Sequence, residues 1–271
     1  MPERIAELIR EVARTELVPR FRALADHEII EKTPGDLVTV ADQAAEDRLA
    51  PGLRDLVPGC LVIGEEATHA SPALLNRVGE DGPVFVVDPL DGTANFAAGR
   101  PFFATMVARL HKGKPVAGWI YDPLDDQMLM AEEGGGTWLN GRKLTLDGDP
   151  ILAEARGSAQ VRLLEQPYKA LLDDRRGRFI DHGSTLCAGH DYLRLLTGAM
   201  DFLLYWRTMP WDHAPGAIIV SEAGGAVGRP GGQPFICDPA SRGILSARSS
   251  ALWRQARDTL LPDFVPGTVG S

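Results

Sequence analysis

The feature that most constrains the fold is a pair of short apolar runs that each end in acidic side chains. The runs span residues 61–63 and 84–87, are rich in β-branched residues and are bounded by glycine or proline, which predicts two buried strands. Glu65 follows the first run after one glycine, and Asp88 follows the second run directly. In sheets flanked by helices, ligands bind beyond the strand ends, because loops converge there without disturbing the core. We therefore expect both acids at one ligand site.

Apolar periodicity predicts further helices and strands along the chain. Helices are predicted at residues 5–12, 45–56, 188–197, 212–223 and 252–260, and a strand at residues 202–206. The glycine-rich stretch 105–146 predicts an antiparallel meander, with Asn140-Gly141 as a hairpin turn. The charged residues 173–178 are typical of a connector. Asp212 suits the N-cap of the fourth helix, and Pro215 would lie in its first turn, where proline is tolerated.

The composition excludes several classes of protein. With 271 residues, 44% of them hydrophobic, the chain has enough apolar side chains for a sizeable core, and no linker-like tract interrupts it. Its 28 basic and 37 acidic residues give a net charge of −9, which argues against a general binder of nucleic acid or anionic membrane. Cys60, Cys187 and Cys237 show no paired spacing, so neither a disulfide framework nor a zinc knuckle is predicted. The amphipathic, charged residues 1–17 and the lack of a long apolar run predict a cytoplasmic protein without a membrane span.

The acids fall in three separated segments, residues 64–66, residues 88–93 and Trp211-Asp212. Four of them are predicted to hold hard divalent cations such as Mg²⁺ through oxygen: Glu65, Asp88, Asp91 and Asp212. Without a cation, clustered carboxylates would repel one another. This pattern therefore predicts a cation site that leaves positions for water and a substrate phosphate.

Gly92 and Thr93 add the features that a phosphate requires. A glycine lets the backbone approach an anion closely, and the N–H groups at a helix start can hold its oxygens. The Thr93 hydroxyl has a second possible role. If Asp42 lies beside it, the carboxylate accepts a hydrogen bond from the threonine, and the threonine orients an attacking water.

With these residues, the sequence resembles the inositol monophosphatase family of magnesium-dependent, lithium-sensitive phosphatases. The resemblance rests on DPLDGTANF at residues 88–96 and WDHAPGAIIVSEAGG at residues 211–225, supported by GEE at 64–66 and DLVTVAD at 36–42. It implies an α+β fold, the layered α-β-α-β-α sandwich shared with fructose-1,6-bisphosphatase. It also implies one unit over residues 1–271, with an N-terminal part to about 147, a C-terminal part over about 148–262 and a tail over 263–271.

The resemblance also implies roles for individual residues. The metal shell, for two or three Mg²⁺ ions, would be Glu65, Asp88, the Leu90 carbonyl, Asp91 and Asp212. Thr93 and Asp42 would activate the water, and with Glu65 they are the expected catalytic residues. Gly92 and Thr93 would bind the phosphate through their amides, beside Asp91 and Asp212, while Glu66 would be an outer acid. The implied enzyme is a homodimer that hydrolyses a small phosphorylated metabolite by direct attack of water, without a covalent phosphoenzyme.

Several other motifs favour ordinary structural interpretations. Residues 122–125 repeat Asp-Pro-Leu-Asp, but Asp126 and Gln127 follow in place of a glycine and a threonine, which predicts a hairpin turn. His213, next to a helix start, is typical of an exposed residue or a helix-end partner and is given no catalytic role. The basic residues 175–178 are typical of a solvated loop, with a charged substrate in a neighbouring subunit as the alternative.

One departure from the family pattern leaves the substrate open. Tyr205 occupies the position where members that hydrolyse inositol phosphates commonly have a glutamate that contacts sugar hydroxyls. An inositol-1-phosphate-type substrate is the main prediction. Histidinol phosphate, a 3′(2′),5′-bisphosphate nucleotide and fructose 1,6-bisphosphate are the alternatives within the family. A regulatory binding role in ribosomal RNA transcription is the alternative outside enzymology, and the retained acids disfavour it.

Overall fold

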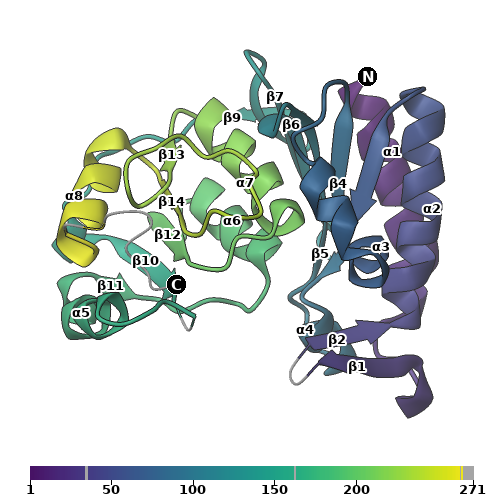
Figure 1. Cartoon of the computed structure of the whole chain (residues 1–271), viewed down its shortest axis with the longest axis horizontal. Helices are drawn as coiled ribbons and strands as arrows, with labels where there is room; N and C mark the ends of the chain where they lie inside the picture. The colour runs from purple at the N-terminus through teal and green to yellow at the C-terminus, as the bar shows by residue number, and fades with distance from the viewer. Residues whose placement is uncertain (34–35, 162, 263, 265–271) are drawn as a thin grey trace.

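The computed structural model describes residues 1–33, 36–161, 163–262 and 264 (Figure 1). Its larger half is built on a seven-stranded sheet in the order β3-β4-β5-β6-β7-β8-β9. The strands are β3 (Leu61–Gly64), β4 (Val84–Asp91), β5 (Ala104–His111), β6 (Lys114–Asp122), β7 (Gln127–Glu132), β8 (Gly136–Leu139) and β9 (Arg142–Leu144). Only β3 and β4 pair in parallel, and the later strands form the predicted antiparallel meander. Asn140 and Gly141 both have positive φ angles, 47° and 77°, as a tight hairpin turn between β8 and β9 requires.

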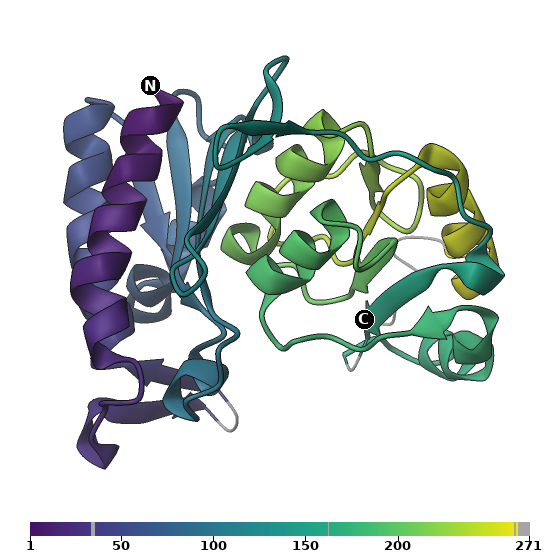
Figure 2. The same cartoon turned by 180° about the vertical axis from the view of Figure 1, so that it is seen from behind.

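A second, five-stranded sheet forms the smaller half, in the order β11-β10-β12-β14-β13. Its strands are β10 (Arg156–Gln160), β11 (Ile180–Asp181), β12 (Phe202–Tyr205), β13 (Ala226–Gly228) and β14 (Ile244–Ala247). Seen from behind, the chain that follows β9 crosses from the larger sheet to this half (Figure 2). The two sheets therefore use consecutive parts of the chain.

Helices fill the remaining three layers (Figures 1 and 2). The outer face of the larger sheet is covered by α1 (Pro2–Val12) and α2 (Val40–Leu56), and α6 (Ala188–Leu196) and α7 (Pro210–Glu222) lie between the two sheets. The smaller sheet is covered on its far side by α5 (Tyr168–Arg175) and α8 (Ser250–Leu260). This arrangement is the α-β-α-β-α sandwich that the family resemblance implies.

Strand β4 is buried on both faces, which explains its unbroken apolar run. Phe85 and Val87 pack in the core beneath α1 and α2, whereas Val84 and Val86 pack in the core that contains Trp211 of α7. A strand covered on both sides carries apolar residues at every position instead of at alternate ones. The first polar side chain after the run, Asp88, is consequently held where the two covering layers meet at the strand end.

Shorter elements complete the description. They are the hairpin of β1 (Ile29–Thr33) and β2 (Asp36–Thr39), the helices α3 (Glu65–Ala70) and α4 (Thr93–Ala97), a π-helical turn at Ala13–Leu17, and 3-10 turns at Val18–Arg20, Asp26–Glu28, Pro72–Arg77, Leu152–Glu154 and Arg176–Arg178. The three cysteines are buried and free. Within the described ranges, no helix has the length and apolar character needed to cross a membrane.

Two local predictions are wrong. Residues 173–178 are not a simple connector, because α5 runs to Arg175 and its Leu172 is buried against the core that α8 shares. Asp212 is not the N-cap of α7: the helix begins at Pro210 with Met209 as its N-cap, so Asp212 lies inside the first turn. Pro215 consequently sits in the second turn of the helix. The predicted tail beyond residue 262 lies outside the described residues, apart from Phe264.

Candidate active site

Carboxylates from both halves of the chain meet at the end of β4. Asp88 and Asp91 end that strand, and Asp212 reaches them from the first turn of α7. Burial raises the pKa of Asp88 well above its usual range, and the nearby carboxylates of Glu65, Asp91 and Asp212 raise it further. The pKa of Asp212 is raised well above its usual range by the same two causes, burial first and then Glu65 and Asp91. The three segments predicted to converge therefore do so.

Asp88 and Asp212 affect each other's ionisation. The carboxylate of Asp212 raises the pKa of Asp88, and the neighbouring carboxyl group of Asp88 lowers the pKa of Asp212 against the larger effect of burial. Two ionised carboxylates that lie close together repel each other, so the protonated form of one of them is favoured. Asp88 is only 3% exposed, so water provides little screening. The pair thus requires a positive charge, which either a proton or a metal cation can supply.

Asp91 is held by the beginning of α6. Its Oδ2 accepts hydrogen bonds from the Gly189 amide at 2.6 Å and from the Cys187 thiol at 2.9 Å. These bonds favour the ionised form, but burial has the larger effect and the pKa of Asp91 is raised. The second half of the chain therefore fixes one acid of the first half through Cys187 and Gly189.

Glu65 and Glu66 lie at the start of α3 and share a cation. The Nζ atom of Lys32 is 3.3 Å from Oε1 of Glu65 and 3.0 Å from Oε1 of Glu66. The backbone of the same turn is held by the buried Glu46, which accepts hydrogen bonds from the amides of Glu66 and Ala67 at 2.9 and 2.8 Å. The sequence pattern does not indicate Lys32 or Glu46. Lys32 lies on a hairpin that is distant in sequence from Glu65, and Glu46 occupies an ordinary helical position.

Asp42 and Thr93 form the predicted contact. The Thr93 hydroxyl lies 2.9 Å from Oδ1 of Asp42 and 3.0 Å from the Leu90 carbonyl oxygen. The other oxygen of Asp42 accepts hydrogen bonds from the amide and hydroxyl of Thr39, which caps α2. Burial raises the pKa of Asp42 to about 7, although the bonds from Thr39 and Thr93 lower it. A carboxylate that titrates near neutrality and is bonded to a hydroxyl is suited to proton transfer.

Gly92 makes the sharp turn between β4 and α4. Its φ is 87°, in the left-handed region, and a Cβ atom there would lie 2.6 Å from the Phe102 carbonyl oxygen and 3.1 Å from Cβ of Cys187. A side chain is therefore excluded by conformation and by space. Because Thr93 and Ala94 are the first residues of a helix, their N–H groups have no acceptor within it. This geometry is suited to an anion.

The donor set fits a hard divalent cation by its chemistry. All the converging groups are oxygen donors, and burial together with the neighbouring carboxylates raises the pKa values of Asp88 and Asp212. Among the residues that the structure describes, no three His, Cys, Asp or Glu side chains are arranged as a finished metal shell. Glu65 and Asp91 are instead bonded to Lys32, Cys187 and Gly189, so small rotations of these side chains would be needed to direct their oxygens to one ion.

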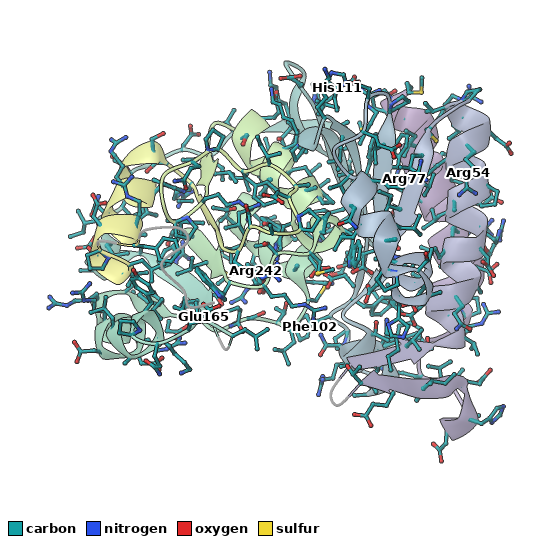
Figure 3. The ribbon with its side chains drawn as sticks, viewed as in Figure 1. Arg54, Arg77, Phe102, His111, Glu165 and Arg242 are labelled. Carbon is teal, nitrogen blue, oxygen red and sulfur yellow. The ribbon has the colours of Figure 1, made fainter. Side chains whose placement is uncertain are left out.

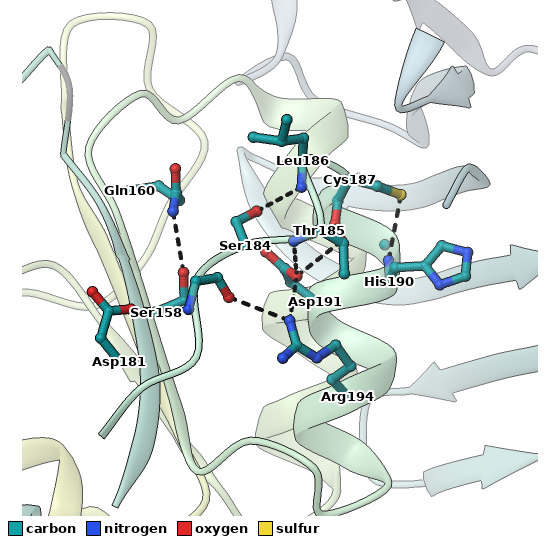
Figure 4. A network of polar contacts seen from close by, with 12 residues as sticks. Ser158, Gln160, Asp181, Ser184, Thr185, Leu186, Cys187, His190, Asp191 and Arg194 are labelled. Atoms are coloured by element: carbon teal, nitrogen blue, oxygen red, sulfur yellow. Dashed lines mark hydrogen bonds and ion pairs between the residues drawn. The ribbon is translucent and has the colours of Figure 1, made fainter. Parts of the chain in front are cut away.

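Tyr205 is engaged beside the site. Its hydroxyl donates a hydrogen bond of 2.5 Å to Oδ2 of Asp191, a fully buried acid. Oδ1 of Asp191 accepts bonds from the amide and hydroxyl of Thr185, both at 2.9 Å, and Arg194 lies at 3.5 Å (Figure 4). Tyr205 thus holds the chain that precedes α6, and its hydroxyl proton is committed to Asp191.

The remaining motifs singled out in the sequence have structural roles. Residues 122–125 form the predicted turn between β6 and β7, with Oδ1 of Asp122 accepting hydrogen bonds from the amides of Leu124 and Asp125. Of the two interpretations of His213, an exposed residue or a helix-end partner, the first is wrong: His213 is 1% exposed, and burial lowers its pKa to about 3. Its ring contacts the Arg207 carbonyl and the Tyr192 hydroxyl, which is a structural role. The basic residues 175–178 are partly engaged, since Arg176 pairs with Asp173 and Asp181.

Known proteins match this chain over nearly its whole length. A sequence model described as the inositol monophosphatase family matches residues 3–265. The chain belongs to the inositol monophosphatase family. Inositol monophosphatase 2 of Solanum lycopersicum is 36% identical over 208 residues, which cover 74% of this chain and 77% of that protein. The chain is therefore a phosphoric monoester hydrolase.

Solved structures agree with the fold. The inositol monophosphatase of Thermotoga maritima superposes with a TM-score of 0.75 at 26% identity, covering 94% of this chain and 93% of that one. A second inositol monophosphatase, solved with inositol monophosphate bound, has a TM-score of 0.78 at 23% identity, covering 97% and 95%. The layered fold expected of the family is thereby confirmed.

Proposed function

We propose that this enzyme hydrolyses a small phosphate monoester, of the inositol-1-phosphate type, with Mg²⁺ bound at the end of β4. The ions would be held by Glu65, Asp88, Asp91, Asp212 and the Leu90 carbonyl. The observation that carries this proposal is the convergence of Glu65, Asp88, Asp91 and Asp212 at the end of β4, where the neighbouring carboxylates add to burial in raising the pKa values of Asp88 and Asp212. When bound, the metal supplies positive charge to the phosphoryl oxygens and increases the acidity of a water molecule.

The chain's own residues supply orientation and proton transfer. The N–H groups of Gly92 and Thr93 bind the phosphate oxygens at the start of α4, which fixes the phosphorus for in-line attack. The Thr93 hydroxyl donates to Asp42 and thereby directs its own lone pair towards the attacking water. Asp42 holds the proton that the relay releases, for which its pKa of about 7 is suitable. Water attacks phosphorus directly, so no side chain becomes phosphorylated.

The leaving group is the less constrained part of the proposal. At the position where relatives that hydrolyse inositol phosphates carry an acid, this chain has Tyr205. Its hydroxyl donates a hydrogen bond to Asp191 and is therefore not free to bind a sugar hydroxyl. Inositol-1-phosphate remains the first choice because the named relatives act on that class. Histidinol phosphate, a 3′-phosphoadenosine nucleotide and fructose 1,6-bisphosphate are the substrates to compare with it. We propose a homodimer that lithium inhibits, as the family resemblance implies.

The test is phosphate release from these four substrates with Mg²⁺, with EDTA, and with Mg²⁺ plus lithium. We expect release from at least one substrate with Mg²⁺, loss of release with EDTA and inhibition by lithium. Asp88→Asn is the blank, since it removes a proposed ligand at nearly constant volume. The absence of metal-dependent release from every substrate by folded protein would reject the proposal. Release from fructose 1,6-bisphosphate or a nucleotide alone would correct the substrate and leave the site unchanged.

A further inference from the structure

A cavity of about 720 Å³ lies in the smaller half, away from the acid cluster. It opens between the loop that joins β13 to β14 and the chain that follows β10, and its lining includes Glu165, Trp206, Arg229, Ile236, Arg242 and Phe264. Figure 3 shows Glu165 and Arg242 on this half. None of the acids proposed to bind metal lines the cavity. Trp206 belongs to the core shared with α8, whereas its neighbour Tyr205 packs towards α6 and α7, so the cavity lies on the other face of β12.

The cavity contains a buried cation, the guanidinium of Arg229. Arg229 is 7% exposed, and within the described residues no carboxylate forms an ion pair with its guanidinium. Its Nη1 donates to the Gly243 carbonyl at 2.9 Å and to the Thr208 hydroxyl at 3.3 Å, and its Nη2 donates to the Ile236 carbonyl at 2.6 Å. These acceptors are all neutral. Burial has the largest effect on the pKa of Arg229 and lowers it, although the exposed carboxylate of Asp238 acts in the opposite direction.

Aromatic and basic side chains lie around Arg229. The guanidinium stacks on Phe235 at 4.7 Å, and the indole N–H of Trp206, itself 3% exposed, has no hydrogen-bond partner in the described chain. Arg242 adds a second positive charge at the rim. Two acids also reach the rim, but Asp238 already accepts hydrogen bonds from the Ala240 amide and the Ser241 hydroxyl. The other acid, Glu165, is exposed to solvent.

We propose that this cavity binds a small organic oxyanion whose body is apolar or aromatic. A buried charge is stable only when it is paired, and an oxyanion at Arg229 would pair it by charge-assisted hydrogen bonds. The apolar body would lie against Trp206, Ile236 and Phe264. The site is separate from hydrolysis, because it shares no lining residue with the acid cluster.

Nuclear magnetic resonance of the tryptophan indole N–H groups tests this inference. The full-length protein, labelled with ¹⁵N and kept in EDTA, is titrated with benzoate, with benzyl alcohol as the neutral control and benzylamine as the cationic control. Trp206→Phe assigns the reporting resonance among the five tryptophans of the chain. Trp211, next to Asp212, reports separately on the acid cluster. We expect benzoate alone to shift the Trp206 resonance saturably and to leave Trp211 unchanged.

Two variants identify the cation responsible. Arg229→Met should lower the affinity for benzoate on the order of 10-fold or more, as loss of a charge-assisted hydrogen bond predicts. If this variant does not fold, Arg242→Ala, at an exposed position, should still weaken binding by a smaller factor. The inference is overturned if benzoate causes no saturable shift of Trp206, or if benzyl alcohol and benzylamine bind equally well. Arg229 would then only brace the loop. A shift of Trp211 alone would place the anion at the acid cluster and also reject the inference, without affecting the proposed hydrolysis.

Discussion

At the scale of single residues, the acids of the site work against folding when no cation is present. Each of Asp42, Asp88, Asp91 and Asp212 has a raised pKa, so the folded protein binds more protons than the unfolded chain. For such groups the favourable contribution is present at low pH and is lost as the pH rises through the folded-state pKa. For Asp42 that window runs from the usual value of 3.8 to about 7. These acids therefore lower the stability of the metal-free protein as the pH rises.

Substitution of Asp88 should separate stability from activity. Asp88→Asn removes one negative charge from the buried pair, so the melting temperature of the metal-free protein should rise at about pH 8. Phosphate release should fall by at least about 100-fold, because a ligand and its charge are lost. Thermal melting and a phosphate assay on the same sample measure both effects. Asp125→Asn, in the second Asp-Pro-Leu-Asp turn, is the control, and an equal loss of activity there would show that the wrong copy of the motif was assigned.

The Thr93 hydroxyl can be tested by two substitutions of similar size. Thr93→Val keeps the shape of the side chain but removes the bond to Asp42, so kcat should fall by about 100-fold or more. Thr93→Ser keeps a hydroxyl and should retain most of the activity. Steady-state kinetics on both variants give the comparison. Equal rates for the valine and serine variants would mean that the hydroxyl takes no part in the reaction.

The contributions of these residues could be predicted only in part. The chain positions of Asp88, Asp91 and Gly92 could be inferred because a strand and a turn follow one another directly. The contact of Asp42 with Thr93 joins segments 51 positions apart, and it was expected from a family resemblance. Lys32, Glu46 and Cys187 could not be found, since local patterns do not show which distant donor will reach an acid.

At the scale of elements, a close contact between β3 and α2 sets the direction of the first acidic segment. Gly64 ends β3 beside Glu46 of α2, and a Cβ atom at this position would lie 2.2 Å from the carboxyl carbon of Glu46. Glu46 in turn accepts the first free amides of α3, as a capping side chain does. The start of α3, and hence Glu65, depends on this fit.

Gly64→Ala should therefore destabilise the protein by about 1–3 kcal/mol, the usual effect of overpacking. Unfolding in urea measures the change. Gly79→Ala is the matched control, because a Cβ atom there meets no atom within 4 Å and its φ is not in the left-handed region. If the two variants had the same stability, the turn between β3 and α3 would have room that the structure does not show.

Helices and strands with a clear apolar periodicity were predicted correctly, whereas those without one were missed or misplaced. The strands β3 to β8 and the helices α2, α6 and α8 carry apolar patterns that are long or sharply bounded, and these predictions were confirmed. The helix α5 is short and mostly charged, and only Leu172 of it is buried, so its sequence did not differ from that of a connector. The start of α7 was misplaced because Met209, an unusual N-cap, precedes a proline.

At the scale of the whole molecule, the site joins two halves that are built on separate sheets. Asp212 and the donors to Asp91 come from the helices between the sheets, whereas Asp88 and Asp91 come from the larger sheet. A bound cation would therefore stabilise the contact between the halves. No pattern in the sequence specifies this packing, since the layers are assembled by contacts distant along the chain.

The pH dependence of stability follows from this arrangement. The melting temperature of the metal-free enzyme should fall as the pH rises from about 5 to about 8, because the buried acids lose their protons. Millimolar Mg²⁺ should raise it more at about pH 8 than at about pH 5, since ligand binding stabilises only the folded state and requires ionised acids. Differential scanning fluorimetry at each pH measures both trends. A cation effect that did not depend on pH would contradict this interpretation.

Calorimetric titration of Mg²⁺ into the metal-free enzyme at about pH 8, alongside phosphate release at each Mg²⁺ concentration, shows whether the acids at the end of β4 hold the catalytic metal. If the buried acids at the end of β4 bind the metal used in hydrolysis, the wild type will bind Mg²⁺ saturably and phosphate release will increase in parallel with occupancy. Asp88→Asn will show much weaker binding. Absence of Mg²⁺ binding by the folded wild type, or equal binding by Asp88→Asn, would mean that these acids do not bind the metal.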